Sequence, residues 1–421
     1  MINRINRFRI ATTMSWFILT CGLAQAAPDP AGQAPFKSFF PLMAWDDVEN
    51  TATIKKMADC GINSIAFVPP NLLDACADNG IKAIVFDEHV TPNWDKPFDA
   101  ERALGVLPGL IEKYNNHPAV LGYHLKDEPD AGQFAALGKA CDLVSKLSPG
   151  AWPYINLTPG MGDWYVKDYV QAFVDACHPP VLSYDNYPIG ETGTFSYGYW
   201  ANMHDVRQVS VANDIPFHTI LLTSAHWNYR VPTAGDLRLM AYGALAYGAR
   251  GLGYYKFRSR PLSVLGAPDL GNFREAPLDQ YDEKTPTWDT LRNLNHQIAN
   301  LAPTLLDLKT SDVYHIGEIP ERNHGVTSSS LIQSMQSGTG FIVGEFHDSK
   351  DAAWVMVVNK DLANSAFCRP VYIAKPTHVQ YLSPITGELT DFPDPWYALA
   401  PGQGVLMKLT FSPTAGESAK P

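Results

Sequence analysis

Two adjacent carboxylates, Asp127 and Glu128, follow an apolar run at residues 119–125 and precede Pro129. Such a run predicts a buried strand. Two adjacent acids at the end of a buried strand cost free energy of folding unless a cation or hydrogen bond stabilises them or they take part in the function. If the two side chains converge, the charge of Asp127 raises the pKa of Glu128, which suits a carboxylic acid that donates a proton. The structural alternative is that Asp127 caps a following helix, with Pro129 in its first turn.

A second carboxylate is the usual partner of such an acid. The candidates at predicted strand ends are Asp46, Asp87, Glu88 and Asp185. We choose Asp185 because Tyr184, Asn186 and Tyr187 surround it with polar and aromatic groups; a carboxylate that caps the next loop is the alternative.

Further polar and aromatic residues at predicted strand ends could contact a substrate. We expect these contacts from Trp45, Asp87, His124, Asn156, Tyr184, Tyr187, His226, Trp227 and Tyr254. Singly, each ring could instead be a core residue, and each histidine a satisfied structural group. Lys256 and Arg258, just past the last of these strands, could bind an acidic group, although a solvated basic pair is the simpler interpretation.

The elements that carry these residues alternate regularly. Helical stretches separate eight apolar runs, at residues 38–45, 62–68, 81–86, 119–125, 152–157, 181–184, 216–223 and 251–256. This alternation predicts an α/β fold, a (β/α)8 TIM barrel over residues 35–308, whose active site lies at the carboxyl ends of the strands. A doubly wound open sheet is less consistent with the sequence, which has neither GxGxxG nor a P-loop.

The pattern changes after residue 308. Short alternating runs occupy residues 313–319, 330–334, 340–345, 353–359, 378–381 and 404–409, with turn residues between them. They predict a C-terminal antiparallel β-sandwich over residues 309–412, with residues 394–396 in a Pro-containing loop. The polar residues 413–421 are expected to form a disordered tail.

The N-terminus predicts export. Arginines at positions 4, 7 and 9 precede an apolar stretch and an Ala24-Gln25-Ala26 cleavage site, so residues 1–26 are expected to be a signal peptide. No later stretch is long and apolar enough to enter a membrane. We therefore expect a soluble protein of the periplasm or the extracellular space, with its oligomeric state open.

Composition restricts the partners and cofactors. The formal charge of −11 and the pI of about 5.5 argue against nucleic acid or an anionic membrane. The five cysteines after residue 26 lie in apolar patterns without metal-binding spacing, so we expect buried core thiols, with a disulfide still possible. We expect neither a metal nor another cofactor.

The stretch from Asn116 to Pro129 resembles the retaining (β/α)8 glycoside hydrolases of families 42, 5 and 2, in which Asn-Glu-Pro ends the fourth strand. The resemblance implies that Glu128 is the general acid/base of an enzyme that cleaves O-glycosidic bonds in a poly- or oligosaccharide. In those enzymes a glutamate ends strand seven, whereas residues 218–226 of this chain contain no carboxylate. Asp185 is the expected replacement, as a nucleophile or as the base of an inverting reaction.

Three other hypotheses remain open. The Asp127-Glu128 pair also resembles hexosaminidases of families 20 and 123, in which Asp127 would orient an N-acetyl group that attacks in place of a protein nucleophile, with Tyr184 or Tyr187 as a hydrogen-bond donor. A saccharide-binding barrel without turnover fits the missing strand-seven glutamate. A metal-dependent hydrolase could use Asp87, His89 and Asp185, but no compact metal-binding motif supports it.

Overall fold

The computed structural model describes residues 38–91, 96–193, 195–196, 198–259 and 273–412. The predicted signal peptide at 1–26 and the predicted tail at 413–421 lie outside these residues. No helix within the described part is long and apolar enough to cross a bilayer.

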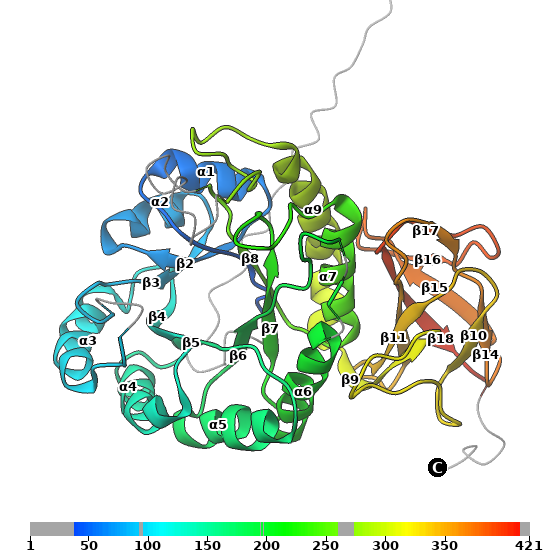
Figure 1. Cartoon of the computed structure of the whole chain (residues 1–421), viewed down its shortest axis with the longest axis horizontal. Helices are drawn as coiled ribbons and strands as arrows, with labels where there is room; N and C mark the ends of the chain where they lie inside the picture. The colour runs from blue at the N-terminus through cyan, green and yellow to red at the C-terminus, as the bar shows by residue number, and fades with distance from the viewer. Residues whose placement is uncertain (1–37, 92–95, 194, 197, 260–272, 413–421) are drawn as a thin grey trace, which may run out of the picture. The chain divides into compact units, whose positions relative to one another are not determined.

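Eight parallel strands close into a barrel, each paired with its neighbour in sequence and β8 paired back to β1 (Figure 1). The barrel strands are β1 (Leu42–Asp47), β2 (Ser64–Val68), β3 (Lys82–Val85), β4 (Val120–Asp127), β5 (Trp152–Leu157), β6 (Leu182–Asp185), β7 (Phe217–Leu222) and β8 (Leu252–Tyr255). The predicted TIM barrel is therefore confirmed, with strand bounds that differ from the predicted ones by a few residues.

Helices surround the barrel (Figure 1). They are α1 (Thr51–Asp59), α2 (Leu73–Asp78), α3 (Ala100–Tyr114), α4 (Phe134–Leu147), α5 (Ala172–Cys177), α6 (Gly198–Asn213), α7 (Ala234–Ala246) and α9 (Pro286–Asp307), with a π-helical turn (Tyr165–Gln171) before α5 and single 3-10 turns at Pro70–Leu72 and Ala131–Gln133. Their starts follow local chemistry: Asn50 and Asp99 cap α1 and α3, and Thr233 forms a capping box with Asp236 at the start of α7.

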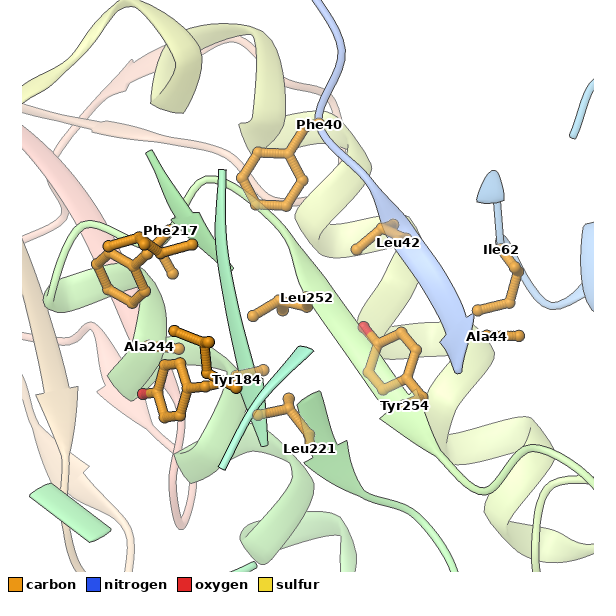
Figure 2. Close-up of a cluster of buried hydrophobic side chains, with 14 of the residues drawn as sticks. Phe40, Leu42, Ala44, Ile62, Tyr184, Phe217, Leu221, Ala244, Leu252 and Tyr254 are labelled. Atoms are coloured by element: carbon orange, nitrogen blue, oxygen red, sulfur yellow. The ribbon is translucent and has the colours of Figure 1, made fainter. Parts of the chain in front are cut away.

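The barrel strands bury two sets of side chains because successive residues point to opposite faces. One cluster, which includes Trp45, Phe67, Trp152 and Tyr154, belongs to the barrel interior. The larger cluster fills the layer between strands and helices, and Figure 2 shows part of it, with Tyr184 and Tyr254 among its members. This division decides which strand residues can reach the mouth of the barrel.

The C-terminal part forms an antiparallel sheet of six strands in the order β16-β15-β18-β12-β11-β9, with two small two-stranded sheets, β10-β14 and β13-β17. The strands are β9 (Lys309–Ile316), β10 (Ile332–Met335), β11 (Phe341–His347), β12 (Ala353–Asn359), β13 (Ala366–Phe367), β14 (Pro370–Tyr372), β15 (His378–Leu382), β16 (Leu389–Asp391), β17 (Ala398–Leu399) and β18 (Gly404–Thr410). The predicted sandwich is confirmed as an antiparallel β domain, and the four short strands β13, β14, β16 and β17 were not predicted.

The two faces of the six-stranded sheet have different partners. Alternate residues such as Val343, Val355 and Met407 pack with side chains of the small sheets. Residues of the opposite face, among them Ile342 and Met356, belong to the same buried cluster as helix α7. The residues that the structure describes, from position 38 onward, accordingly belong to one compact unit. Helix α9 ends at Asp307 and β9 begins at Lys309, and the domain division at 308/309 stays a prediction.

The cysteines behave as core residues. All five that the structure describes are buried and unpaired. The expectation of buried thiols is confirmed for Cys60, Cys76, Cys141, Cys177 and Cys368.

Candidate active site

Glu128 lies one residue beyond β4, at the carboxyl end of the barrel. Its side chain is exposed, and its φ of +43° is unusual for a residue with a side chain. The Glu128 N–H donates to the carbonyl oxygen of Asn156 at 2.8 Å, which holds the turn against the end of β5. Partial desolvation at the barrel mouth raises the pKa of Glu128, and the charge of Lys126 opposes this shift. A strained turn that presents a carboxyl group with a raised pKa is typical of a proton donor.

Asn156 connects the two other carboxyl groups. Its Nδ2 donates to Asp127 Oδ1 at 3.2 Å and to Asp185 Oδ1 at 2.7 Å, although its own side chain is fully buried. The three residues come from the adjacent strands β4, β5 and β6, and Asp127 and Asn156 are direct partners in the barrel ladder. The fold thus brings together Glu128, Asp127 and Asp185, the three residues predicted to be catalytic. Asn156, which was predicted as a substrate contact, is instead a fully buried bridge between the two aspartates.

Both aspartates resist ionisation. Burial, and then the neighbouring charge of Glu128, raise the pKa of Asp127 to about 7. Burial together with the charges of Glu128 and Asp127 raises the pKa of Asp185 well above its ordinary value, while the Asn156 hydrogen bond lowers it. Because the three carboxyl groups repel one another, the ionisation of each depends on the protonation of the other two.

A buried hydrogen-bond network lies beneath Asn156 and fixes its orientation. Ser183 donates to Asn156 Oδ1 at 2.9 Å, and Ser183 also contacts Tyr154 at 2.9 Å and His218 at 2.8 Å. Burial lowers the pKa of His218 to about 3, so its imidazole is neutral at physiological pH. Because the Asn156 carbonyl accepts from Ser183, its NH2 group must face the two aspartates. Sequence reasoning missed Tyr154, Ser183 and His218, which resemble ordinary strand residues.

Aromatic side chains form a wall beside the carboxyl groups. Tyr187 stacks on Tyr255 with ring centroids 5.6 Å apart, and His226 meets the edges of both rings at 5.4 and 5.2 Å. Tyr229 also packs against Tyr187, at 5.6 Å. After burial, the charge of Asp185 contributes most to raising the pKa of Tyr187 and of Tyr229, which places both phenols near that carboxyl group. The predicted residues Tyr187 and His226 therefore lie at the site.

Trp227 extends this wall into solvent. The residue is 61% exposed, and its ring packs edge-on against His226 with ring centroids 5.5 Å apart. A large exposed indole next to a polar site is a suitable platform for the apolar face of a sugar.

Trp45 and His124 lie deeper in the barrel than predicted for contact residues. Both are buried: Trp45 packs on Phe67 and Tyr255, and His124 packs on Phe67 and Phe86. Burial lowers the pKa of His124 to about 3. They line the floor beneath the site instead of its opening.

Asp87 remains within its own loop. Its carboxylate accepts from the His89 backbone N–H and contacts the His89 ring, both at 2.8 Å. Asp185 is held by Asn156, so the structure does not gather Asp87, His89 and Asp185 as the metal-site hypothesis requires. In the described part of the chain no three carboxylate, imidazole or thiol groups converge as metal ligands.

Two tyrosines predicted as substrate contacts are misplaced. Tyr184 and Tyr254 are fully buried in the layer between barrel and helices, where Tyr254 donates to Asn295 Oδ1 at 2.6 Å (Figure 2). The neighbours Asp185 and Tyr255 occupy the opposite face of their strands. The error is therefore one residue in register, which reverses the side that a strand residue faces.

The basic residues after β8 are neither solvated nor free for an acidic substrate. Lys256 is buried and pairs with Asp46 and with Asp47, the latter at 2.6 Å. Arg258 pairs with Glu49 at 2.9 Å. Burial outweighs the Lys256 charge and raises the pKa of Asp46 to about 6. The sequence suggested either a site for an acidic group or a solvated basic pair, and both interpretations are wrong. The acidic partners lie in and just after β1, about 210 residues earlier in the chain, so the sequence alone does not reveal them.

The end of β7 contains no acid. The observed strand, Phe217–Leu222, agrees with the predicted run, and residues 217–229 include neither Asp nor Glu. An error of register therefore does not account for the missing strand-seven glutamate.

The fold and the site define the class: a (β/α)8 barrel with a C-terminal β domain and clustered carboxyl groups at the barrel mouth. No family model matches this sequence, and no curated protein matches it. Solved structures match the whole architecture. One is described as a glycoside hydrolase, with a TM-score of 0.55 and 13% identity over 89% of this chain and 93% of that one.

A second match is a glycoside hydrolase of family 5 from Bacteroides vulgatus ATCC 8482. It has a TM-score of 0.54 and 13% identity over 90% of each chain. At this identity the likeness establishes the shared fold, including the C-terminal β domain, for this chain.

Proposed function

We propose that this protein is a glycoside hydrolase in which Glu128 is the general acid/base and Asp185 the second carboxylate. The observation that carries the proposal is the Asn156 bridge, which holds Asp127 and Asp185 together beside an exposed Glu128. Carboxyl groups at the carboxyl end of such a barrel are where its chemistry takes place. The shared fold of the solved glycoside hydrolases supports the same conclusion.

The chemistry follows from the protonation states. A raised pKa keeps Glu128 protonated long enough to transfer its proton to the glycosidic oxygen as the bond to the anomeric carbon breaks. The positive charge that develops on the sugar ring favours ionised Asp185, which attacks the anomeric carbon or takes a proton from the attacking water. If Asp185 attacks, the Glu128 carboxylate takes a proton from the water that displaces Asp185 from the anomeric carbon, and this restores the acid form of Glu128. If Asp185 instead takes the proton of the attacking water, Asp185 releases that proton to solvent and Glu128 is reprotonated from solvent.

The aromatic wall supplies sugar binding. Exposed Trp227 offers a stacking surface, and Tyr187 and Tyr229 place phenol groups beside Asp185. We propose a poly- or oligosaccharide as substrate. The N-terminal sequence further leads us to propose that the protein acts outside the cytoplasm.

A substrate-assisted reaction is the second candidate. The observation that favours it is the absence of an acid at the end of β7 together with the position of Asp127, which is tied to Asn156 next to Glu128. In that case Asp127 orients a 2-acetamido group, and activity requires a 2-acetamido sugar. A protein carboxylate remains our preferred choice because Asp185 shares the Asn156 donor at the shorter distance.

The test is a glycan panel assayed by reducing-end release, with Glu128→Gln as the variant. The substitution is nearly isosteric and replaces the carboxyl group with an amide that cannot transfer a proton, so turnover should fall about a hundredfold or more. Glu112→Gln, on the helix α3, is the matched control and should retain full activity. Turnover that barely changes in Glu128→Gln would refute the assignment of Glu128, and saccharide binding without any turnover would favour a binding protein.

A further inference from the structure

We propose a second saccharide-binding site in the C-terminal β domain, separate from the barrel mouth. Its centre is a cavity of about 420 Å³ lined by residues of β14, β15 and β16 and by residues that follow β10 and β16. Strand β16 lies at one edge of the large sheet, and β14 belongs to the small sheet β10-β14 (Figure 1). Small-molecule sites typically have volumes of this order. The inference deepens the proposed function by adding a site that holds substrate away from the carboxyl groups.

The lining of the cavity combines hydrogen-bonding groups with rings. Arg369, Thr377, His378 and Asp391 supply polar groups, and Tyr372 and Phe392 supply aromatic surface. His378 and Asp391 pair at 2.9 Å across β15 and β16, so each is already oriented. Fixed polar groups beside aromatic faces suit a ligand that carries many hydroxyl groups and has an apolar ring face.

An exposed aromatic pair lies at the rim of the cavity. Trp396 is 72% exposed, and its ring meets Phe367 edge-on, with centroids 6.2 Å apart. The Arg369 guanidinium lies 4.9 Å from the Phe367 centroid and 5.9 Å from that of Trp396, and Arg369 Nε donates to the Pro395 carbonyl at 3.0 Å. Arg369 therefore links the rim rings to the cavity, because Arg369 and Pro395 both line it.

The charges in and around the cavity select the class of ligand. The positive Arg369 is balanced by the carboxylates of Asp391 and Asp394, and His378 is paired with Asp391. A strong anion would be repelled by the two aspartates and a strong cation by Arg369, whereas a neutral polyhydroxylated ligand would meet no such repulsion. We therefore assign the site to a neutral saccharide, with one sugar ring on Trp396 and its neighbour in the cavity.

The test uses the full chain with Glu128→Gln, which slows turnover about a hundredfold or more, in native gels that contain xylan, galactan, mannan or mixed-linkage β-glucan. A gel that contains the polyanion polygalacturonate is run beside them. At least one of these neutral polysaccharides should retard the protein. Adding Trp396→Ala should weaken that retardation about tenfold in apparent Kd, on the scale of one lost ring contact. Ile385→Ala is the matched control, because Ile385 is a 76% exposed apolar side chain in the turn between β15 and β16.

Several outcomes would overturn the inference. One is that none of the four polysaccharides retards the protein, and another is that only the polyanion polygalacturonate does. The others are equal retardation with and without Trp396→Ala, and a loss of retardation in Ile385→Ala equal to that in Trp396→Ala. The proposed function fails separately: Trp396-dependent retardation of a chain that hydrolyses no glycan would support this site and refute the enzyme. Conversely, Trp396→Ala with Glu128 intact should hydrolyse a short soluble saccharide at the wild-type rate.

Discussion

Removing the bridging amide offers the sharpest test of the carboxyl cluster. Asn156→Leu keeps the branching of the side chain but deletes both N–H donors, which hydrogen-bond to Asp127 and Asp185 at 3.2 and 2.7 Å. These bonds lower the pKa of both aspartates, so their loss should raise both further.

The size of the shift follows from the energy of such a bond. A hydrogen bond to a charged group is worth about 1.5–3 kcal/mol, and one pKa unit corresponds to about 1.4 kcal/mol. If ionised Asp185 is required for the reaction, the acidic limb of kcat/KM should move upward by about one to two pH units. A pH–rate profile on the substrate identified in the glycan panel measures this shift.

Asn295→Leu provides the control for lost stability. Asn295 is also a fully buried amide with two hydrogen bonds, to Tyr254 at 2.6 Å and to the Cys60 carbonyl at 2.9 Å, but it lies on helix α9. Asn295→Leu should lower the free energy of unfolding without moving the acidic limb of kcat/KM. A uniform fall in rate for Asn156→Leu, with the limb in its wild-type position, would show that the bridge does not control a catalytic ionisation.

Three further predictions concern stability. Lys256→Met should cost about 3–5 kcal/mol in denaturant unfolding because it leaves Asp46 buried without its cation, and Asp46→Asn in the same chain should recover much of the loss; no recovery would contradict the pairing. Gly344→Ala should lower Tm by several degrees because a Cβ there would lie 2.0 Å from the Ala246 carbonyl oxygen, and an unchanged Tm would contradict that packing. The pKa of Asp127 is raised from 3.8 to about 7, so its charge destabilises the fold increasingly as pH rises through this window. Between pH 4 and 8 the free energy of unfolding of Asp127→Asn should therefore rise by about 1–2 kcal/mol relative to wild type, a value discounted for partial exposure. A difference that does not depend on pH would exclude this explanation.

The sequence predicted the barrel because the signals are local and repeated. Eight apolar runs with helical periodicity between them leave few alternatives, and the strand ends then place Asp127, Asn156 and Asp185 at one rim. The Asn156 bridge itself depends on neighbouring strands that lie about 29 residues apart in the chain, and only the closed sheet brings them together.

The errors arose where the sequence does not encode which side a residue faces. Tyr184 and Asp185, like Tyr254 and Tyr255, are adjacent polar or aromatic residues, and the composition of a short strand does not say which of each pair points inward. Lys256 presents a different difficulty. Its acidic partners are more than 200 positions earlier in the chain, so the pair forms only when β8 closes against β1.

The apolar character of helix α7 has a consequence for biosynthesis. Eleven of its thirteen residues are buried, since the barrel covers one side of the helix and the β domain the other. As the chain leaves the ribosome, helix α7 precedes β11, β12 and β18 by about a hundred residues or more. Until those strands emerge, the nascent barrel exposes the apolar surface of helix α7, which a chaperone would have to shield. Interrupted translation after residue 308 should therefore produce aggregates in place of a small working barrel.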